Sequence, residues 1–420
     1  MIQEINKTWG TSKRWQTSLI LVLFAIFTGG LNYVGWPEKT ATFPRVLSIL
    51  LLIYFVTKIR LTKLQNFRYF ILALAFMPFI SVIYSYQEYG QPVYDGIKGT
   101  LPSMIWLLYF VLHCFKVESG SFFKAVFCVA VLIAFIQIFQ QFTYPDVLFG
   151  ITRDEESLNP VEELAENRNG FWRFRFGDTG YFAAMMLFLL WSAWLKKMKM
   201  NLELVITFLL MFVSIYLTLT RQIIFSVLLT LFISYFTDRK SIKVWMFVFG
   251  IFAVGLLYSY SDILFAEFVE QTDSEINNDN YIRILAATYF WNETFSSVSA
   301  AFLGHGIPVS GNFLQLHQEL MEYYRFFVSD VGFIGMMWRH GVIYVMVCYA
   351  LLINLLWQKR RQVPGFIRLF TLFTIIPSIM IFPMANILQR IIWCFLLYYC
   401  DLTINYNKTH EKEACINSQL

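Results

Sequence analysis

The fold of this 420-residue chain is decided by stretches such as residues 122–141, FFKAVFCVAVLIAFIQIFQQ, in which one lysine is the only charged residue. A helix of roughly 20 predominantly apolar residues is long enough to cross the hydrocarbon core of a membrane. Hydrophobic residues make up 57% of the whole chain and charged residues only 15%. That charged share is about ten points below the share in an ordinary soluble domain. The composition therefore predicts an integral membrane protein.

The same apolar pattern recurs on both sides of this stretch and predicts about a dozen membrane-spanning helices. The candidate spans are residues 17–35, 43–58, 69–87, 99–115, 122–141, 179–195, 201–219, 222–237, 243–260, 330–357, 366–384 and 387–403. We therefore expect an all-α integral membrane protein. An even number of spans would put both ends of the chain on the same side.

The charges on the loops predict which side that is. With the N-terminus inside, 21 of the 33 Lys and Arg residues lie on inner segments, but only seven of the 28 Asp and Glu residues do. Short cytoplasmic loops are enriched in Lys and Arg, so both termini are predicted to be cytoplasmic. The basic inner face suits contact with anionic membrane lipid. The basic residues are spread over many loops, and this pattern does not indicate nucleic-acid binding.

Two predicted outer loops are much longer than the other connections. Loops of more than about 15 residues are usually functional or disordered. Amphipathic patterns at residues 281–285 and 316–324 of the second loop predict helices on the membrane surface, with a turn at 304–308 between them. The predicted order is membrane helices in 1–141, an outer loop in 142–178, membrane helices in 179–260, a large outer loop in 261–329, and membrane helices with a cytoplasmic tail in 330–420.

Arginines gather in these outer segments. They are Arg168, Arg173, Arg175, Arg221, Arg283 and Arg325, and Arg221 ends the sequence LTLTR at residues 217–221 between two spans. A guanidinium group keeps its charge and can grip two phosphate oxygens at once. Together the arginines indicate an anionic ligand, such as a diphosphate. Each one alone has a simpler interpretation, as an interfacial anchor or as a partner for the outer acids.

His317 is the candidate general base. An imidazole can accept a proton from a hydroxyl group near neutral pH, and Glu319 and Glu322 are close enough in sequence to share or orient that role. A lone loop histidine is more often incidental, and this interpretation stays open. His305, between two turn glycines, we interpret as a filler.

The segment before the span 330–357 contains a second set of polar candidates. Asp330 is expected to cap the helix that follows, and glycines at 332, 335 and 341 allow close packing. Arg339 and His340 fall inside the span, so they must face protein or a water-filled cavity. Arg390, near the outer end of the last span, is subject to the same constraint.

Familiar catalytic motifs are absent from the sequence. It contains no P-loop, no dinucleotide-binding fingerprint, no HExxH, no GxSxG and no cysteine or histidine spacing typical of a metal site. We therefore expect a function that needs no metal ion, nucleotide or other cofactor.

The order of these motifs resembles the bacterial O-antigen polymerase and ligase family. The resemblance rests on LTLTR at 217–221, Arg283 in a surface helix, LGHG at 303–306, a His-Gln-x-Leu element at 317–320 and SDVGFIG at 329–335. It covers about half of the chain, from Arg168 to Gly341. Each motif alone is weakly specific, whereas their shared order is moderately specific.

The resemblance implies a membrane glycosyltransferase that uses a lipid carrier, in the bacterial inner membrane with its active site facing the periplasm. The donor would be a glycan on undecaprenyl diphosphate, with Arg221 and Arg283 binding the diphosphate and His317 as the base. We assign Glu319 to the catalytic group as well. Arg173, Arg175, Arg325 and Asp330 are further candidates for substrate binding. A chain-length-regulating protein is a partner that the resemblance leaves open.

Three functions remain in competition. SDVG before a glycine-containing span favours a repeat-unit polymerase, which is our first expectation. The His317-Gln318 pair also fits the start of the ligase motif, although Gly332 follows later than that motif requires, and a ligase would transfer the glycan to lipid A core. A lipid-linked oligosaccharide flippase is the rival of another class. The gathering of arginines outside the membrane counts against a flippase.

Overall fold

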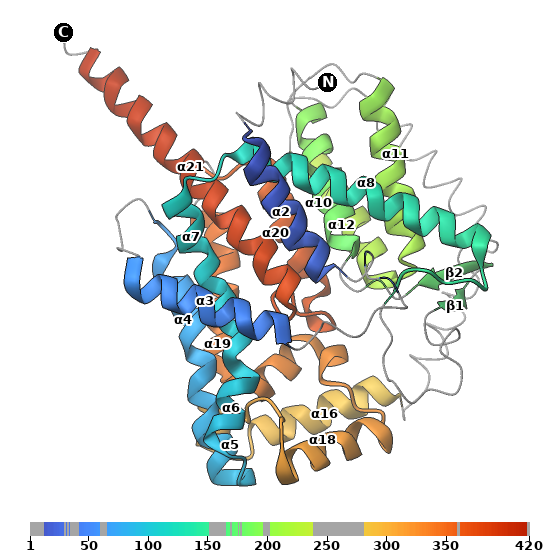
Figure 1. The fold of residues 1–420 in the computed structure, drawn as a ribbon, viewed down its shortest axis with the longest axis vertical. Helices are drawn as coiled ribbons and strands as arrows, with labels where there is room; N and C mark the ends of the chain where they lie inside the picture. The colour runs from blue at the N-terminus through green and yellow to red at the C-terminus, as the bar shows by residue number, and fades with distance from the viewer. Residues whose placement is uncertain are drawn as a thin grey trace. The chain divides into compact units, whose positions relative to one another are not determined.

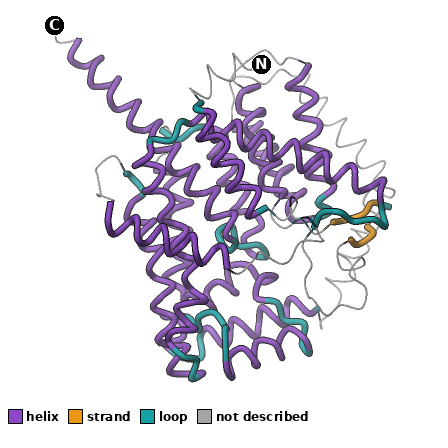
Figure 2. The backbone as a smooth tube through the Cα atoms, viewed as in Figure 1, coloured by secondary structure: helices purple, strands orange, loops and turns teal. Residues whose placement is uncertain are grey.

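The computed structural model describes residues 12–28, 31, 33, 42–58, 65–150, 165–168, 170–174, 176, 179–195, 202–237, 281–358 and 362–417. Helices make up most of this described part, and one pair of short strands accompanies them (Figure 2). The chain divides into two units, which we describe separately. The first comprises Met1–Pro37 and Glu118–Asp279, and the second comprises Glu38–Val117 and Asn280–Leu420.

The first unit is built from five helices and a two-stranded hairpin within its described residues. The elements are α2 (Arg14–Phe27), α8 (Ser119–Thr143), β1 (Ala165–Arg168), β2 (Phe171–Phe174), α10 (Thr179–Leu195), α11 (Leu202–Leu217) and α12 (Arg221–Thr237). Gln141, near the end of α8, attaches the hairpin to that helix. The amide of Gln141 accepts from the Trp172 N–H at 2.9 Å and donates to the Trp172 carbonyl at 2.6 Å.

The second unit contains the rest of the described helices. They are α3 (Thr42–Lys58), α4 (Arg68–Phe76), η2 (Met77–Ile80), α5 (Ser81–Tyr89), α6 (Val93–Thr100), η3 (Leu101–Leu107), α7 (Leu108–Phe115), α16 (Ile282–Thr294), α17 (Val298–Leu303), α18 (Gly311–Glu322), η4 (Val328–Val331), α19 (Gly332–Ile353), η5 (Asn354–Gln358), α20 (Gly365–Ile375), η6 (Ile376–Ile379) and α21 (Ile387–Asn417). Figure 1 shows α16 and α18 at the same end of this unit as α5 and α6.

Five described helical segments are long and apolar enough to cross a membrane. They are Arg68–Tyr89, Val93–Phe115, Ser119–Thr143, Val328–Trp357 and Ile387–Tyr406. Five shorter apolar helices accompany them, at Arg14–Phe27, Gly180–Leu195, Leu202–Leu217, Arg221–Tyr235 and Gly365–Ile379. The architecture is that of an all-α membrane protein, as the composition predicts.

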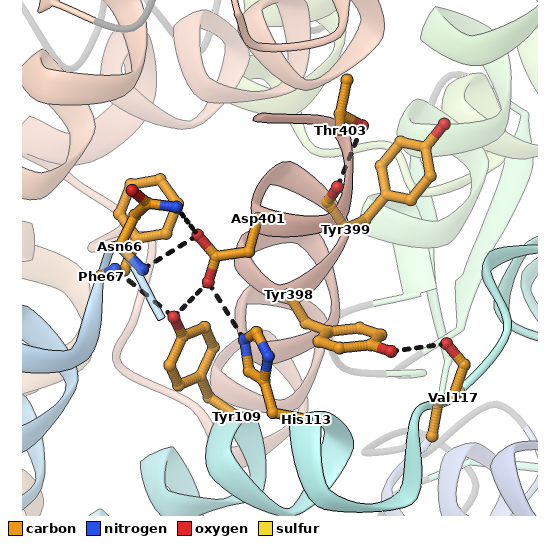
Figure 3. A network of polar contacts seen from close by, with 9 residues as sticks. All are labelled: Asn66, Phe67, Tyr109, His113, Val117, Tyr398, Tyr399, Asp401 and Thr403. Carbon is orange, nitrogen blue, oxygen red and sulfur yellow. Dashed lines mark hydrogen bonds and ion pairs between the residues drawn. The ribbon is translucent and has the colours of Figure 1, made fainter. Parts of the chain in front are cut away.

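Two groups of polar contacts mark opposite ends of the second unit. At one end Asp401, which is fully buried, accepts hydrogen bonds from the Asn66 backbone N–H at 3.1 Å and its side-chain amide at 2.8 Å (Figure 3). The carboxylate also accepts from the Tyr109 hydroxyl and from His113 Nε2, the latter at 3.0 Å. The start of α4, the end of α7 and the middle of α21 therefore meet at this end.

At the other end, the turn between α5 and α6 holds the loop between α17 and α18. The amide of Gln91 accepts from the Val309 N–H at 2.8 Å and donates to the Ile307 carbonyl at 3.1 Å. The Ser310 hydroxyl donates to Asp95 at 2.7 Å. The long late loop is thus attached to the helices at the end away from Asp401.

The predicted spans agree with the described helices in position but not always in length. The span 179–195 coincides with α10, whereas helical structure in the span 366–384 stops at Ile379 and α21 continues well past residue 403 to Asn417. Helix α2 ends at Phe27, before the end of the predicted span 17–35. The expected span 243–260 lies outside the described residues.

Within the two predicted loops, one expectation is confirmed and one element was not anticipated. Residues 282–294 and 311–322 are helical, which confirms a helix at each of the patterns 281–285 and 316–324, although the second helix ends at Glu322. The hairpin of β1 and β2 has an antiparallel register, with Arg168 opposite Phe171. Its signal is the Asn-Gly pair at 169–170, because this dipeptide favours two-residue hairpin turns.

The main irregularity of the second unit is a break inside α19. Gly341 has φ 82° and ψ 162°, which no residue in a continuous helix adopts. In an unbroken helix the carbonyls of Trp338 and Arg339 would accept from residues 342 and 343. Here they accept from the N–H groups of His305 and Gly306 at 2.7 and 2.9 Å. The glycine-rich turn thus supplies hydrogen bonds at the break.

Candidate functional site

The periodicity of α18 places His317 against the core of the second unit. Phe313 and Leu320 are buried and, with His317 at positions i, i+4 and i+7, share one face of the helix. This face packs in a cluster with residues of α16, η4 and α19. The cluster comprises Ala286, Phe290, Phe313, Leu320, Val328, Val331 and Trp338. The amphipathic pattern of α18 therefore fixes where the candidate base lies.

His317 is half-buried beside Trp338. The two rings are inclined by 21° and their centroids are 6.2 Å apart. The Nδ1 atom of His317 is enclosed and has no hydrogen-bond partner among the described residues. Burial, followed by the positive charge of Arg339, lowers the pKa of His317 to about 4. The imidazole is therefore neutral at physiological pH and has a nitrogen free to accept a proton.

His305 has a structural role that the sequence reading missed. It is 1% exposed, and its Nδ1 is 2.5 Å from the Tyr89 hydroxyl. Its Nε2 is 3.1 Å from the carbonyl of Glu293. Because a carbonyl only accepts, Nε2 carries the proton and Nδ1 accepts from Tyr89. Our interpretation of this histidine as a filler is wrong. It joins α5, α16 and the break in α19.

The turn and the break approach so closely that side chains would not fit between them. A Cβ atom at Gly304 would lie 2.4 Å from the Gly341 nitrogen, and a Cβ atom at Gly341 would lie 2.2 Å from the Phe302 carbonyl oxygen. Of the glycines that the sequence suggests for close packing, Gly341 therefore brings a loop, rather than another helix, against α19. This contact fixes the backbone on both sides of Arg339.

Three basic side chains lie around the break. Arg390 and His340 are 7% and 5% exposed, and Arg339 is partly buried with its Nε fully enclosed. Arg390 donates to the carbonyls of Met384 and Ala385 at 3.1 and 2.8 Å. Among the described residues, no carboxylate pairs with Arg339 or Arg390. Their charges lie close enough to repel one another.

The other predicted residues of the second unit lie on its surface helices and connections. Arg283 is half-buried over the Tyr281 ring, at 5.9 Å from the centroid, and Arg325 is exposed with φ 57°. Glu319 is exposed. Asp330 accepts from the Ser329 hydroxyl at 3.2 Å. In the part of the chain that the structure describes, none of these four forms a hydrogen bond or ion pair with His317.

Asp330 does not cap α19, contrary to our expectation. It belongs to η4, and the N-cap position of α19 is Val331, without a side-chain hydrogen bond to the helix. Gly332, with φ 50°, turns the chain between the two elements. This turn leaves the carboxylate of Asp330 outside the first turn of α19.

Four of the predicted arginines belong to the first unit, namely Arg168, Arg173, Arg175 and Arg221. Arg173 on β2 donates from Nη2 to the Thr220 hydroxyl at 3.4 Å and pairs with Glu166 at 3.6 Å. Arg221 follows Thr220 directly and begins α12. The hairpin therefore brings Arg173 to the Leu-Thr-Leu-Thr-Arg turn at residues 217–221. Arg175 lies outside the described residues.

The described residues contain no group of three or more His, Cys, Asp or Glu side chains placed to hold a metal ion. The basic side chains at the break are instead suited to an anion, because guanidinium groups donate to phosphate and carboxylate oxygens.

The fold and this site define an all-α membrane protein with a basic centre, where surface helices meet a broken apolar helix. Compared with known proteins, the chain matches no family profile and no curated sequence.

Proposed function

We propose that this protein is a membrane glycosyltransferase. It polymerises oligosaccharide repeat units carried on undecaprenyl diphosphate, at the outer face of the bacterial inner membrane. One observation supports this most strongly: the neutral imidazole of His317 is near enough to the partly buried guanidinium of Arg339 for that positive charge to oppose its protonation. A proton acceptor next to a cation suits a reaction in which a hydroxyl attacks and an anion leaves.

The proposed reaction forms one glycosidic bond and breaks one bond to phosphate. The acceptor hydroxyl oxygen attacks the anomeric carbon of the donor, and the carbon–oxygen bond to the diphosphate breaks. The lipid diphosphate leaves with the electron pair, and a nitrogen of His317 takes the hydroxyl proton. Arginines stabilise the charge that develops on the leaving group. The acceptor and donor must be held in line for the attack.

The arginines proposed for the leaving group are Arg221 and Arg283. In the second unit, Arg283 lies on α16, and α16 packs in the same hydrophobic cluster as α18, the helix that carries His317. In the first unit, Arg221 follows Thr220, which also contacts Arg173. We propose that Arg221 and Arg283 bind the diphosphate, and that Arg173, Arg175, Arg325 and Asp330 line the path of the glycan. Glu319 is proposed to assist His317.

The proposed topology has twelve spans, cytoplasmic termini and outer loops at 142–178 and 261–329. In this topology, successive connections between spans lie on alternate sides of the membrane, and contacts in the second unit support that arrangement. The start of α4 and the end of α7 meet at Asp401, whereas the turn between α5 and α6 meets the loop before α18. In the proposed orientation the first group is cytoplasmic and the second is periplasmic. The reaction would take place at the second.

The experiment is polymer formation in a host that lacks its own polymerase and supplies the matching lipid-linked repeats. Wild type is compared with Arg221→Ala, Arg283→Ala and His317→Ala, after each variant is found in the membrane at equal amounts. A ladder of long chains in wild type and its loss in the variants supports the proposal. Equal ladders in both arginine variants would remove their assignment to the diphosphate.

Two other functions are distinguished by the same experiment. A ligase shares the chemistry but uses lipid A core as the acceptor, so single blocks of glycan would appear on lipid A core instead of a ladder. A flippase is favoured by one observation, the broken helix α19, because discontinuous helices form midplane sites in transporters. Single repeats at the outer surface without chain growth would identify a flippase.

A further inference from the structure

The uncompensated charge around the break in α19 needs an explanation. Arg339 and Arg390 repel one another, and no carboxylate among the described residues pairs with either. A charge inside an apolar protein segment is costly unless a partner offsets it. The break therefore combines two cations whose mutual repulsion a bound anion would relieve.

The enclosed atoms around the break have unused hydrogen-bonding capacity. The Nε of Arg339 and the Nδ1 of His340 are both enclosed and have no partner among the described residues. His340 is 5% exposed and its ring lies 4.9 Å from that of Tyr344. Buried polar atoms are nearly always hydrogen-bonded in native proteins. A ligand with several acceptor oxygens would satisfy them.

The backbone at the break also favours binding of an anion. Residues 342–353 form a second helical segment that begins at Gly341. The first N–H groups of a helix lack intrahelical partners, and the dipole makes this end partly positive. Half-helices that begin inside a membrane protein are used to bind anionic groups. The N–H groups of the second segment therefore begin next to His340.

We propose that the break in α19 is a binding site for a phosphate or diphosphate group, with Arg339 and Arg390 as its cations and His340 as a hydrogen-bond donor. This site rests on the proposed function in one respect, namely that the phosphate or diphosphate group belongs to the lipid carrier. It adds a broken apolar helix to the residues proposed above for recognition of the diphosphate. A bound anion would also offset the charge of Arg339 that opposes protonation of His317. Donor binding would thus make His317 a better base.

The test measures binding to the purified protein in lipid nanodiscs. The probes are undecaprenyl diphosphate, inorganic diphosphate and undecaprenol, which lacks the phosphates. Wild type is compared with Arg339→Gln and Arg339→Lys. The control is Arg68→Gln, which removes an equal charge from the start of α4. This position lies at the opposite end of the same unit, close to the contact between Asn66 and Asp401.

We expect undecaprenyl diphosphate to bind wild type and Arg68→Gln equally, and undecaprenol to bind neither. Arg339→Gln should weaken binding at least tenfold, and Arg339→Lys by a smaller factor, because a lysine keeps the charge but loses the planar fork. If Arg339→Gln does not fold, the lysine variant decides, and wild-type affinity in that variant would overturn the site.

The outcomes separate this site from the proposed function. Equal binding by wild type and both Arg339 variants overturns the site but leaves a transferase with its diphosphate bound elsewhere. Binding of inorganic diphosphate alone, lost in Arg339→Gln, supports an anion site and contradicts a lipid-linked donor. A wild-type protein that binds neither anionic probe contradicts the site directly, while polymer formation in cells would still support the transferase.

Discussion

The imidazole of His305 lies nearly parallel to the indole of Trp338, with an angle of 17° between the rings and 5.3 Å between their centroids. The backbone of the same two residues is joined by a hydrogen bond of 2.7 Å from the His305 N–H to the Trp338 carbonyl. Trp338 also lies beside His317. One buried tryptophan therefore contacts both the turn that holds the helix break and the proposed base.

The hydroxyl of Tyr89 is predicted to stabilise the turn through His305. Tyr89→Phe removes the donor to Nδ1 and leaves a buried nitrogen without a partner, which costs about 1–3 kcal/mol. Thermal unfolding in mild detergent measures the loss. Tyr86→Phe is the matched control, because Tyr86 is 56% exposed. Equal melting temperatures for the two variants would contradict the role of this hydrogen bond.

The break itself is predicted to require glycine at position 341. Gly341→Ala combines a positive φ with a Cβ atom 2.2 Å from the Phe302 carbonyl oxygen. Strain in such a backbone conformation costs of order 1–3 kcal/mol before any clash is counted. Gly90→Ala separates the two effects, because Gly90 also has a positive φ but nothing lies within 4 Å of its added Cβ. We expect a clearly larger fall in melting temperature for Gly341→Ala.

Acid is predicted to destabilise the second unit through its neutral histidines. Burial lowers the pKa of His305 from 6.5 to about 4, partly opposed by its bond to the Glu293 carbonyl. The unfolded chain therefore binds more protons between these values, and stability rises with pH. The contribution is complete above pH 6.5 and is lost as pH falls toward 4. It amounts to about 3 kcal/mol at 1.36 kcal/mol per unit.

His305→Asn tests this pH dependence. It should lower stability at pH 7 and flatten the slope of melting temperature against pH between 6.5 and 4. His317 shifts in the same direction, again through burial first and Arg339 second, so a residual slope should remain. A slope as steep as that of wild type would show that His305 is not the group responsible.

The sequence predicts the helices well because their signal is local. The run at 179–195 is apolar throughout and contains no glycine after position 180, so its ends follow from composition alone. The amphipathic spacing of 313, 317 and 320 likewise places His317 on an inward face. Arg339 and His340 stand out in the sequence because charge is costly inside a span.

The missed features depend on contacts between distant residues. Gly341 looks like a packing glycine in sequence, and only its contact with residues 302–306 reveals a break. His305 looks incidental between two glycines, because its partners are Tyr89 and the backbone of Glu293. The hairpin at 165–174 had a local signal, the Asn-Gly pair, which the apolar periodicity of the surrounding chain obscured.

The buried carboxylate of Asp401 is predicted to hold the opposite end of the second unit together. Asp401→Asn would turn one acceptor oxygen into a donor facing the donors of Asn66, Tyr109 and His113. Leaving such buried groups unpaired costs about 3 kcal/mol. Asp146→Asn is the control, because Asp146 is exposed. Equal unfolding of both variants would contradict the role of Asp401.

The stoichiometry of carrier release tests the account most directly. Purified wild-type protein and His317→Ala are reconstituted in liposomes with repeat units on undecaprenyl diphosphate, and both released carrier and new glycosidic bonds are counted. We predict one undecaprenyl diphosphate released for each bond formed by wild type, and a rate lower by a factor of about 100 or more in His317→Ala. Repeats that cross the membrane with their carrier still attached, and without any new bond, would contradict a transferase.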